Sequence, residues 1–227
     1  MSDRTRPEVM VFDIVETLAS LDPVQARLEE VAGERREIAT WFDLILRDAM
    51  GLTAAGDYAP FVDVATSALD AHTGYTLERE QIDHIVAGFG EMTPQAGAVD
   101  AVRAAADHGF QVVALSNGSQ TNTRGFLERA GVVDLFDEIL TVDAARAWKP
   151  ARAVYDLVVE RTGVPASGHA LVAVHSWDIH GAHRAGWTTG WCSLLEGKPN
   201  ASFAHADVIS SSLQGVVDGV AALPRPS

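Results

Sequence analysis

The sequence has little of three features that would otherwise set its class. Cys192 is the only cysteine, so no disulfide can form within the chain, as is usual in a reducing compartment such as the cytoplasm. Positive charge is scarce: 17 Lys and Arg stand against 31 Asp and Glu, and the formal charge of −14 repels phosphate backbones and anionic membrane surfaces. No apolar run reaches membrane-spanning length, and the polar opening Met1–Pro7 is too short for an export signal. We therefore expect a cytoplasmic protein that binds neither nucleic acid nor membranes.

The sequence does contain the alternating pattern of an α/β fold. Its 227 residues, 47% of them hydrophobic, are enough to bury a substantial core. Short apolar, β-branched runs alternate with helix-like stretches, which predicts a parallel sheet with helices on both faces. The predicted strands are Val9–Phe12, Phe110–Leu115, Glu138–Val142, Ala170–Val174, Thr188–Ser193 and Asp207–Ser210. The predicted helices are Ala96–His108, Gln120–Ala130, Ala151–Thr162, Ile179–Ala185 and Ser212–Ala221.

The alternation stops between Asp22 and about Thr93, where apolar residues recur with the spacing of amphipathic helices. An all-helical block directly after the first strand indicates a cap inserted over the carboxyl ends of the strands. We therefore predict a Rossmann-like core of residues 1–20 and 93–227 and a helical cap of residues 21–92. The predicted cap helices are Val24–Val31, Arg36–Met50, Tyr58–His72 and Arg79–Gly88.

Polar residues follow the predicted strands at several places along the chain. Asp13 comes directly after the first strand, and Ser116–Gly118 follows the second. Lys149 precedes a predicted helix, and His175–Asp178 follows the strand that ends at Val174. Open α/β sheets keep their chemistry at the carboxyl ends of the strands. We therefore expect these residues to lie in one site.

Together these segments resemble the motifs of the haloacid dehalogenase superfamily of hydrolases, and the inserted cap fits that family. Within it, they are most similar to the type II L-2-haloacid dehalogenases. The resemblance covers most of the chain and implies hydrolysis of short 2-haloalkanoic acids to 2-hydroxy acids, with fluoroacetate as a further candidate substrate. The matching segments are Phe12-Asp13-x-x-x-Thr17-Leu18, Leu115-Ser116-Asn117-Gly118-Ser119, Lys149-Pro150-x-x-x-Val154-Tyr155 and Trp177-Asp178-x-x-Gly181-Ala182.

The resemblance implies that Asp13 is a nucleophile, whose carboxylate forms an ester with the substrate that water then hydrolyses. In the phosphatases of the family, the residue two positions later is an aspartate that protonates an alkoxide leaving group. Here that residue is Val15, which has no proton to donate. A halide leaves as a stable anion, so Val15 favours carbon–halogen chemistry. The less favoured alternative is that Asp13 is a helix-capping residue after a strand.

The resemblance also implies roles for the polar residues of the other segments. Ser116 and Asn117 would donate hydrogen bonds to the nucleophile, the substrate carboxylate or the departing halide, and Lys149 would hold the nucleophile ionised. Taken alone, Ser-Asn-Gly is as typical of an ordinary turn. Tyr155 matches a family tyrosine near the nucleophile, with a plain packing role as the alternative. Further candidates for substrate binding are Thr17, Val15 and Trp177.

Asp178 is the residue that distinguishes a metal-dependent reaction from a metal-free one. In the phosphatases, an acidic residue at this position binds Mg²⁺ together with the nucleophile. The dehalogenases use the position without metal, and the resemblance implies that Asp178 holds Lys149 and helps to activate water. One acid in this loop and none at Val15 make a poor set of oxygen ligands for Mg²⁺. We therefore predict no metal and no cofactor, with Mg²⁺ required only if the protein is a phosphatase.

Val15 departs from the familiar L-2-haloacid dehalogenases, which carry a polar or aromatic residue there, and two further positions also depart. His175 stands where they have an asparagine, and its imidazole could be the base for the hydrolytic water, oriented by Asp178, or be satisfied by the backbone. In the cap, Phe42 stands where they have the arginine that receives the halide. Arg47 could replace that arginine, or Trp41 and Phe42 could form an aromatic wall. An aromatic stripe on a helix is more often core than pocket.

The expected partner is a small halogenated carboxylate. The apolar cap segments Trp41–Leu46 and Phe61–Leu69 also indicate a homodimer, in keeping with the family resemblance. Two alternatives stay open: a Mg²⁺-dependent phosphatase or phosphomutase of the same superfamily, and a capped core without turnover that binds a small metabolite or a partner protein. The departures at Val15, Phe42 and His175 motivate the second alternative.

Overall fold

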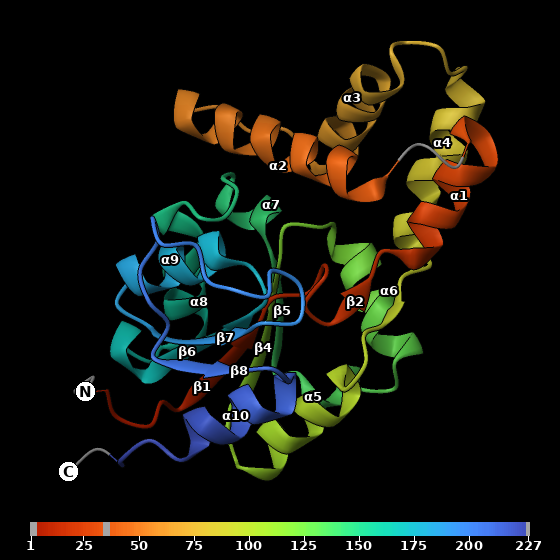
Figure 1. The fold of residues 1–227 in the computed structure, drawn as a ribbon. Coiled ribbons are helices and arrows are strands. Elements are labelled where there is room, and N and C mark those ends of the chain that lie inside the picture. The colour runs from red at the N-terminus through yellow and green to blue at the C-terminus, as the bar shows by residue number, and fades with distance from the viewer. Residues whose placement is uncertain (1–3, 34–36, 226–227) are drawn as a thin grey trace.

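A six-stranded parallel sheet forms the core of the computed structural model, which describes residues 4–33 and 37–225. The strands are β1 (Val9–Phe12), β4 (Gln111–Ser116), β5 (Glu138–Thr141), β6 (His169–Ala173), β7 (Thr188–Cys192) and β8 (Val208–Ser210). They lie in the order β5-β4-β1-β6-β7-β8 (Figure 1). Every residue of β1 is buried, which is why its sequence is continuously apolar rather than alternating.

The order of the strands reverses direction beside β1. From β1 the chain moves outward through β4 to β5, then crosses to the other side of β1 and moves outward through β6, β7 and β8. The crevice beyond the carboxyl ends of the strands at such a reversal is where open α/β sheets bind ligands. Asp13 lies at this point, because it follows β1 directly and its backbone N–H donates to the carbonyl of Val172 in β6 (3.1 Å).

Helices cover both faces of the sheet. Their bounds are α5 (Ala98–Asp107), α6 (Gln120–Arg129), α7 (Val142–Ala145), α8 (Arg152–Thr162), α9 (Ser176–Arg184) and α10 (Leu213–Ala221). Figure 1 shows α5, α6 and α10 on one face and α8 and α9 on the other. The predicted strand at 138–142 ends one residue early, because Val142 already begins α7. Three short 3-10 helices lie at Gly88–Gly90, Val133–Leu135 and Ala166–Gly168.

Four further helices form the cap: α1 (Asp22–Ala32), α2 (Ile38–Ala55), α3 (Phe61–Thr73) and α4 (Arg79–Ala87). The predicted start of the second cap helix, Arg36, lies outside the described residues. The chain enters and leaves the cap through two short antiparallel strands, β2 (Ala19–Ser20) and β3 (Thr93–Pro94). The predicted fold class, a Rossmann-like parallel sheet with an inserted helical cap, is confirmed. No helix among the described residues is long and apolar enough to cross a membrane.

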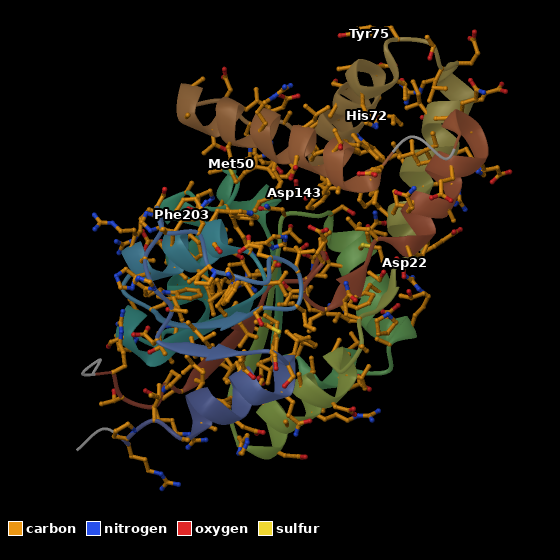
Figure 2. The ribbon with its side chains drawn as sticks, viewed as in Figure 1. Asp22, Met50, His72, Tyr75, Asp143 and Phe203 are labelled. Atoms are coloured by element: carbon orange, nitrogen blue, oxygen red, sulfur yellow. The ribbon has the colours of Figure 1, made fainter. Side chains whose placement is uncertain are left out.

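Aromatic side chains join the cap to the core. Trp41 packs edge-to-face on Phe89 (5.6 Å between ring centroids), and Phe89 packs edge-to-face on Phe61 (4.7 Å). Phe61 in turn lies 6.0 Å from Trp148, which belongs to the core. In Figure 2, Asp143 marks the part of the core that lies beneath α2, and Tyr75 lies at the far tip of the cap. The cap therefore packs directly over the segment that contains Lys149.

Candidate active site

Asp13 is buried at the end of β1, with 4% of its surface exposed, and both of its carboxylate oxygens are engaged. Oδ1 accepts a hydrogen bond from Nζ of Lys149 (2.9 Å). Oδ2 accepts one from the hydroxyl of Thr17 (2.6 Å) and lies 3.3 Å from Nδ1 of His175. The structure therefore brings together four residues that the sequence predicts for the site, from three separate segments of the chain.

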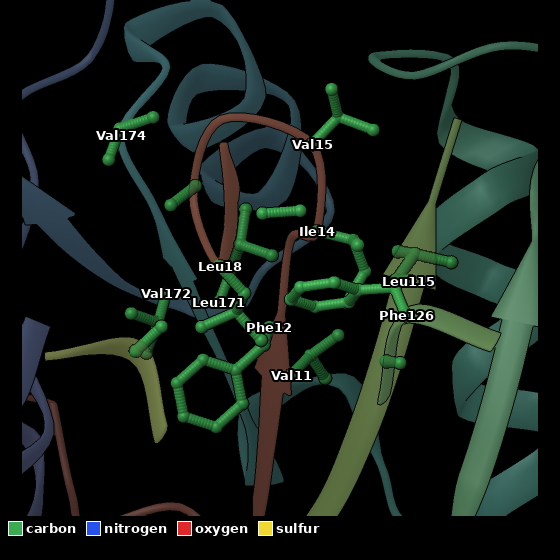
Figure 3. Packing of buried hydrophobic residues seen from close by; sticks show 14 of the residues in the cluster. Val11, Phe12, Ile14, Val15, Leu18, Leu115, Phe126, Leu171, Val172 and Val174 are labelled. Carbon is green, nitrogen blue, oxygen red and sulfur yellow. The ribbon is translucent and has the colours of Figure 1, made fainter. Parts of the chain in front are cut away.

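The loop after β1 curls back on itself and sets the position of Thr17. The backbone N–H groups of Leu18 and Ala19 both donate to the carbonyl of Ile14 (2.9 Å each). Figure 3 shows Ile14 and Leu18 pointing into the apolar cluster, while Val15 lies apart from them at the top of the loop. The Thr17 hydroxyl also accepts the N–H of Val174 (3.2 Å), so it ties the end of β1 to the end of β6. By these two bonds Thr17 fixes the position of the Asp13 carboxylate.

Lys149 lies between two carboxylates and is completely buried. Its ammonium group donates to Asp13 (2.9 Å) and to Oδ2 of Asp178 (2.8 Å). The other oxygen of Asp178 accepts a hydrogen bond from the hydroxyl of Tyr155 (2.6 Å). Gly181 is required on α9 because a Cβ there would collide with the Tyr155 hydroxyl. Lys149, Asp178 and Tyr155 therefore form a closed network on one side of Asp13.

The charges in this network shift one another's pKa values. Burial alone would raise the pKa of Asp13, but the charge of Lys149 and the hydrogen bond with His175 outweigh it and hold the pKa well below its ordinary value. Burial alone would lower the pKa of Lys149, but the two carboxylates raise it. The pKa of Asp178 is raised, because burial and the negative charge of Asp13 outweigh the pairing with Lys149. Asp13 is thus held ionised, as a nucleophile requires.

On the other side of Asp13, the His175 ring lies between two carboxylates. Its Nδ1 faces Asp13 and its Nε2 lies 3.0 Å from Oε2 of Glu16. Burial alone would lower the pKa of His175, but the hydrogen bonds to Asp13 and Glu16 raise it to about 10. The sequence-based expectation that Asp178 orients this ring differs from the structure, in which Asp178 bonds to Lys149 and Tyr155 instead. Trp177 stacks on the His175 ring, with 5.1 Å between the ring centroids.

The segment after β4 lies beside Val15 and Lys149. Ser116 is fully buried, and its hydroxyl accepts the N–H of Gly118 (2.9 Å). The side-chain oxygen of Asn117 accepts the backbone N–H of Lys149 (3.2 Å), which fixes the amide orientation. A Cβ at Gly118 would lie 4.0 Å from Val15, so these two residues are neighbours. This segment therefore joins the site through Lys149 and Val15.

The cap residues that the sequence suggests for the substrate pocket have different surroundings. Trp41 is fully buried within the cap, and its indole N–H donates to the carbonyl of Ala65 (3.0 Å). Phe42 is also buried. The Arg47 side chain is 64% exposed and forms an ion pair with the adjacent Asp48 (2.7 Å). The structure does not bring Trp41 or Arg47 into the group of residues around Asp13. The sequence could not predict this, because the periodicity of a helix defines its faces but not the element that each face contacts.

Trp148, which directly precedes Lys149, makes the polar contacts between core and cap. Its backbone N–H donates to the hydroxyl of Thr53 (3.0 Å), and its indole N–H donates to the carbonyl of Ala59 (3.2 Å). Nearby, the Tyr58 hydroxyl donates to Asp143 of α7. The sequence does not reveal these hydrogen bonds of Trp148, because their acceptors lie 95 and 89 residues away in the cap.

The oxygen donors of the site do not fit a divalent metal ion. Among residues 4–33 and 37–225, no group of three or more His, Cys, Asp and Glu is arranged to hold one. Asp13 and Asp178 share the ammonium group of Lys149, and Val15 supplies no oxygen. Mg²⁺ requires several oxygen ligands in near-octahedral geometry.

Glu16 belongs to the site although the sequence motifs do not indicate it. It lies inside the segment from Asp13 to Thr17, at a position that the motif leaves unspecified. The sequence does have a carboxylate between Asp13 and Thr17, but only the fold reveals that His175 comes to lie against it.

Comparisons with known proteins find relatives over most of the chain. A family model for haloacid dehalogenase-like hydrolases matches residues 7–186. The chain is 28% identical over 187 residues to an (S)-2-haloacid dehalogenase of Pseudomonas sp. (strain YL), covering 80% of this chain and 81% of that protein. It is 26% identical over 193 residues to haloacetate dehalogenase H-2 of Moraxella sp. (strain B), covering 81% and 84% respectively.

Solved structures give the same result for the fold. A crystal structure of an L-2-haloacid dehalogenase with 28% sequence identity superimposes with a TM-score of 0.88, covering 96% of this chain and 100% of that one. The L-2-haloacid dehalogenase of Xanthobacter autotrophicus, with chloropropionic acid covalently bound, superimposes with a TM-score of 0.85 at 22% identity, covering 93% and 97%. The core and its cap are therefore shared with these proteins over nearly the whole chain.

Proposed function

The chain belongs to the haloacid dehalogenase-like hydrolases, and from that premise we propose that it hydrolyses the carbon–halogen bond of short 2-haloalkanoic acids to give 2-hydroxy acids. The observation that carries the proposal is the Asp13 carboxylate, which is buried, paired with Lys149 and followed two positions later by Val15. Such a group is suited to a leaving group that departs without a proton. The names of the similar proteins, (S)-2-haloacid and haloacetate dehalogenases, support the same substrate class.

In the first half-reaction, one oxygen of Asp13 attacks the halogen-bearing carbon from the side opposite the halogen. A carbon–oxygen bond forms as the carbon–halogen bond breaks, so the configuration at carbon inverts and an ester of Asp13 results. Lys149 keeps the nucleophile ionised and fixes its direction. We assign Ser116 and Asn117 as donors to the substrate carboxylate or the departing halide. The Asn117 oxygen is bonded to the Lys149 N–H, which leaves its amide nitrogen to face the substrate.

In the second half-reaction, water attacks the carbonyl carbon of the Asp13 ester. We assign His175 and Asp178 to the activation of this water, since both lie in the cluster around Asp13 and the raised pKa of Asp178 makes it a stronger base than an ordinary aspartate. Cleavage at the carbonyl carbon returns Asp13 with one oxygen taken from water. The reaction needs no metal, because the halide is a stable anion and the hydrolysis is of an ordinary ester.

Halide release from a panel of substrates tests this function. Fluoroacetate, chloroacetate, bromoacetate and both enantiomers of 2-chloropropionate and 2-bromopropionate are incubated with wild-type protein and with Asp13→Asn. We expect halide release by the wild type and a loss on the order of 10⁴-fold or more in the variant, because the nucleophile is absent. No halide from any substrate, or Mg²⁺-dependent hydrolysis of an aryl phosphate, would contradict the proposal.

A single turnover in ¹⁸O-water tests the covalent route separately. If water attacks the ester carbonyl, the label enters the carboxylate of Asp13, and mass spectrometry of the peptide containing Asp13 detects it. If water instead displaces the halide directly, the label enters the 2-hydroxy acid in the first turnover. The second outcome would keep the dehalogenase activity but exclude the ester.

A further inference from the structure

Glu16 lies against His175 on the side away from Asp13, and no motif assigns it a role. Its carboxylate oxygen is 3.0 Å from Nε2 of His175, while Nδ1 of the same ring is 3.3 Å from Asp13. Building on the proposed function, we propose that Glu16 is a positioning residue for ester hydrolysis. Its carboxylate holds the His175 ring against Asp13 and stabilises the imidazolium that forms when His175 takes a proton from the attacking water.

The backbone of Glu16 supports a role for its side chain. Its φ angle is 63°, a left-handed conformation that is uncommon for residues other than glycine. The loop fixes this conformation, because the Glu16 N–H donates to the carbonyl of Ala19 (2.8 Å) and its carbonyl accepts the side-chain amide of Gln95 (3.3 Å). Glycine would adopt this conformation without strain. A carboxylate here is therefore retained at a conformational cost, which points to a function.

The charges around His175 explain how one ring can serve both half-reactions. Among the described residues, Asp13 and Glu16 are the charged groups that pair with the ring. Lys149 bonds to both Asp13 and Asp178, and Glu196 bonds to the neighbouring Ser176. With both contacting carboxylates ionised, the ring is held as imidazolium. Formation of the ester removes the charge of Asp13 and leaves Glu16 as the remaining partner.

The protons released and taken up by His175 are balanced over the catalytic cycle. When the carboxylate of Asp13 becomes an ester and halide departs, the His175 imidazolium loses one of its two anionic partners and releases a proton to solvent. Neutral His175 accepts a proton from water as the hydroxide adds to the ester carbonyl of Asp13. The tetrahedral intermediate collapses, its remaining water-derived proton passes to the departing alkoxide, and Asp13 returns as a carboxylate beside imidazolium. The sum is one haloacid and one water converted to one hydroxy acid, one halide and one proton.

Rapid-quench kinetics with bromoacetate test the role of Glu16. In Glu16→Gln, which keeps the shape of the side chain but not its charge, we expect a normal burst of bromide and a rate of ester hydrolysis lower on the order of 10²-fold. The ester of Asp13 should therefore accumulate and be detected by intact mass. Because the negative charge is lost, the pKa of His175 falls, and the rise in hydrolysis rate with pH should move to lower pH.

Three control variants separate this role from a structural one. Glu16→Gly removes the carboxylate and relieves the backbone, so we expect a Tm equal to or above that of the wild type together with slow ester hydrolysis. Glu16→Asp keeps the charge and should keep the pH profile near that of the wild type. Glu160→Gln removes one charge from an exposed side chain of α8 and should change neither half-reaction. Equal slowing of both half-reactions, or an unmoved pH profile in Glu16→Gln, would overturn the proposal.

A measurement without substrate keeps the two proposals distinguishable. NMR titration of His175 should show a ring protonated to about pH 10 in the wild type, and a lower pKa in Asp13→Asn, which imitates the loss of charge on ester formation, and in Glu16→Gln. An unchanged pKa in both variants refutes the pairing whatever the substrate. A wild type inert to every haloacid, with the pairing intact, instead refutes the proposed function.

Discussion

The two sides of the Asp13 carboxylate differ in how they use charge. On the Oδ1 side, Lys149, Asp178 and Tyr155 form a network in which no member is exposed. On the Oδ2 side, His175 bridges to Glu16, whose side chain is 17% exposed, so solvent reaches the end of the chain of contacts. The first side holds a charge that stays fixed through neutral pH, while the second contains a ring that can gain and lose a proton.

In the mechanism that we propose, this difference separates two tasks of the same carboxylate. As a nucleophile Asp13 must stay ionised, and a fully buried ammonium group that is bonded to two carboxylates provides a constant positive field. As an ester it must be attacked by water, which requires a group that changes its protonation state. The network around Lys149 consists of residues from segments that resemble the family motifs. On the other side, His175 stands where the familiar L-2-haloacid dehalogenases have an asparagine, and the motif leaves the position of Glu16 unspecified.

The largest expected effect comes from removing the fixed charge. In Lys149→Met, two buried carboxylates lose their counter-ion, so we expect the free energy of unfolding to fall by about 3–5 kcal/mol. Halide release should fall on the order of 10³-fold, since the positive group that holds Asp13 ionised is gone. Urea unfolding and halide release from bromoacetate measure the two effects.

The chain offers a matched control for this experiment. Lys198 is the one other lysine in the sequence, and its side chain is exposed. Lys198→Met should change neither stability nor activity appreciably. If Lys149→Met were as stable as the wild type at neutral pH, the ammonium group of Lys149 would not be needed to stabilise the carboxylates of Asp13 and Asp178. The Oδ1 side of Asp13 would then not provide a fixed charge, contrary to the comparison made above.

A smaller effect is expected on the titratable side, and it depends on pH. The pKa of His175 is raised from an ordinary 6.5 to about 10, so its pairing contributes stability that is complete below pH 6.5 and is lost as the pH rises through 10. We expect the wild type to exceed His175→Asn by a few kcal/mol near pH 6, with the difference shrinking steadily toward pH 10. Urea unfolding of both proteins across this range measures the difference. A difference that is independent of pH would mean that the ring is not charged in the folded protein.

Much of the fold could be predicted because it depends on local patterns. The apolar run from Val9 to Phe12 predicts a buried central strand, and the block of helical periodicity after Asp22 predicts an interruption of the sheet. The boundary at Thr141 could not be predicted, because Val142 continues the apolar run although its backbone is helical. Apolar character reports burial, which strand and helix share at such a junction.

The site was predictable wherever it depends on strand ends. Asp13 and Asp178 follow neighbouring strands, and parallel strands bring their carboxyl ends to one edge. The contact of Glu16 with His175 could not be predicted, because it requires a left-handed residue in a loop whose turn the sequence does not specify. The surroundings of Arg47 could not be predicted either, since helical spacing defines a face of the helix but not the element that this face contacts.

The smallest effect is expected from Arg47, and it tests whether charges other than those on the two sides of Asp13 act on the reaction. If the charges that act on the reaction are those on the two sides of Asp13, then an exposed arginine paired with Asp48 contributes little. Arg47→Ala should change the free energy of unfolding by no more than about 0.5 kcal/mol and should leave kcat and KM for bromoacetate and 2-chloropropionate unchanged within error. Arg79→Ala is the matched control, because that exposed cap arginine is likewise paired with a nearby acid, Asp83. An increase in KM for Arg47→Ala alone would show that the cap supplies a cation that reaches the substrate on closure. The cap would then contribute charge to the reaction in addition to the Lys149 network and the pair of Glu16 and His175.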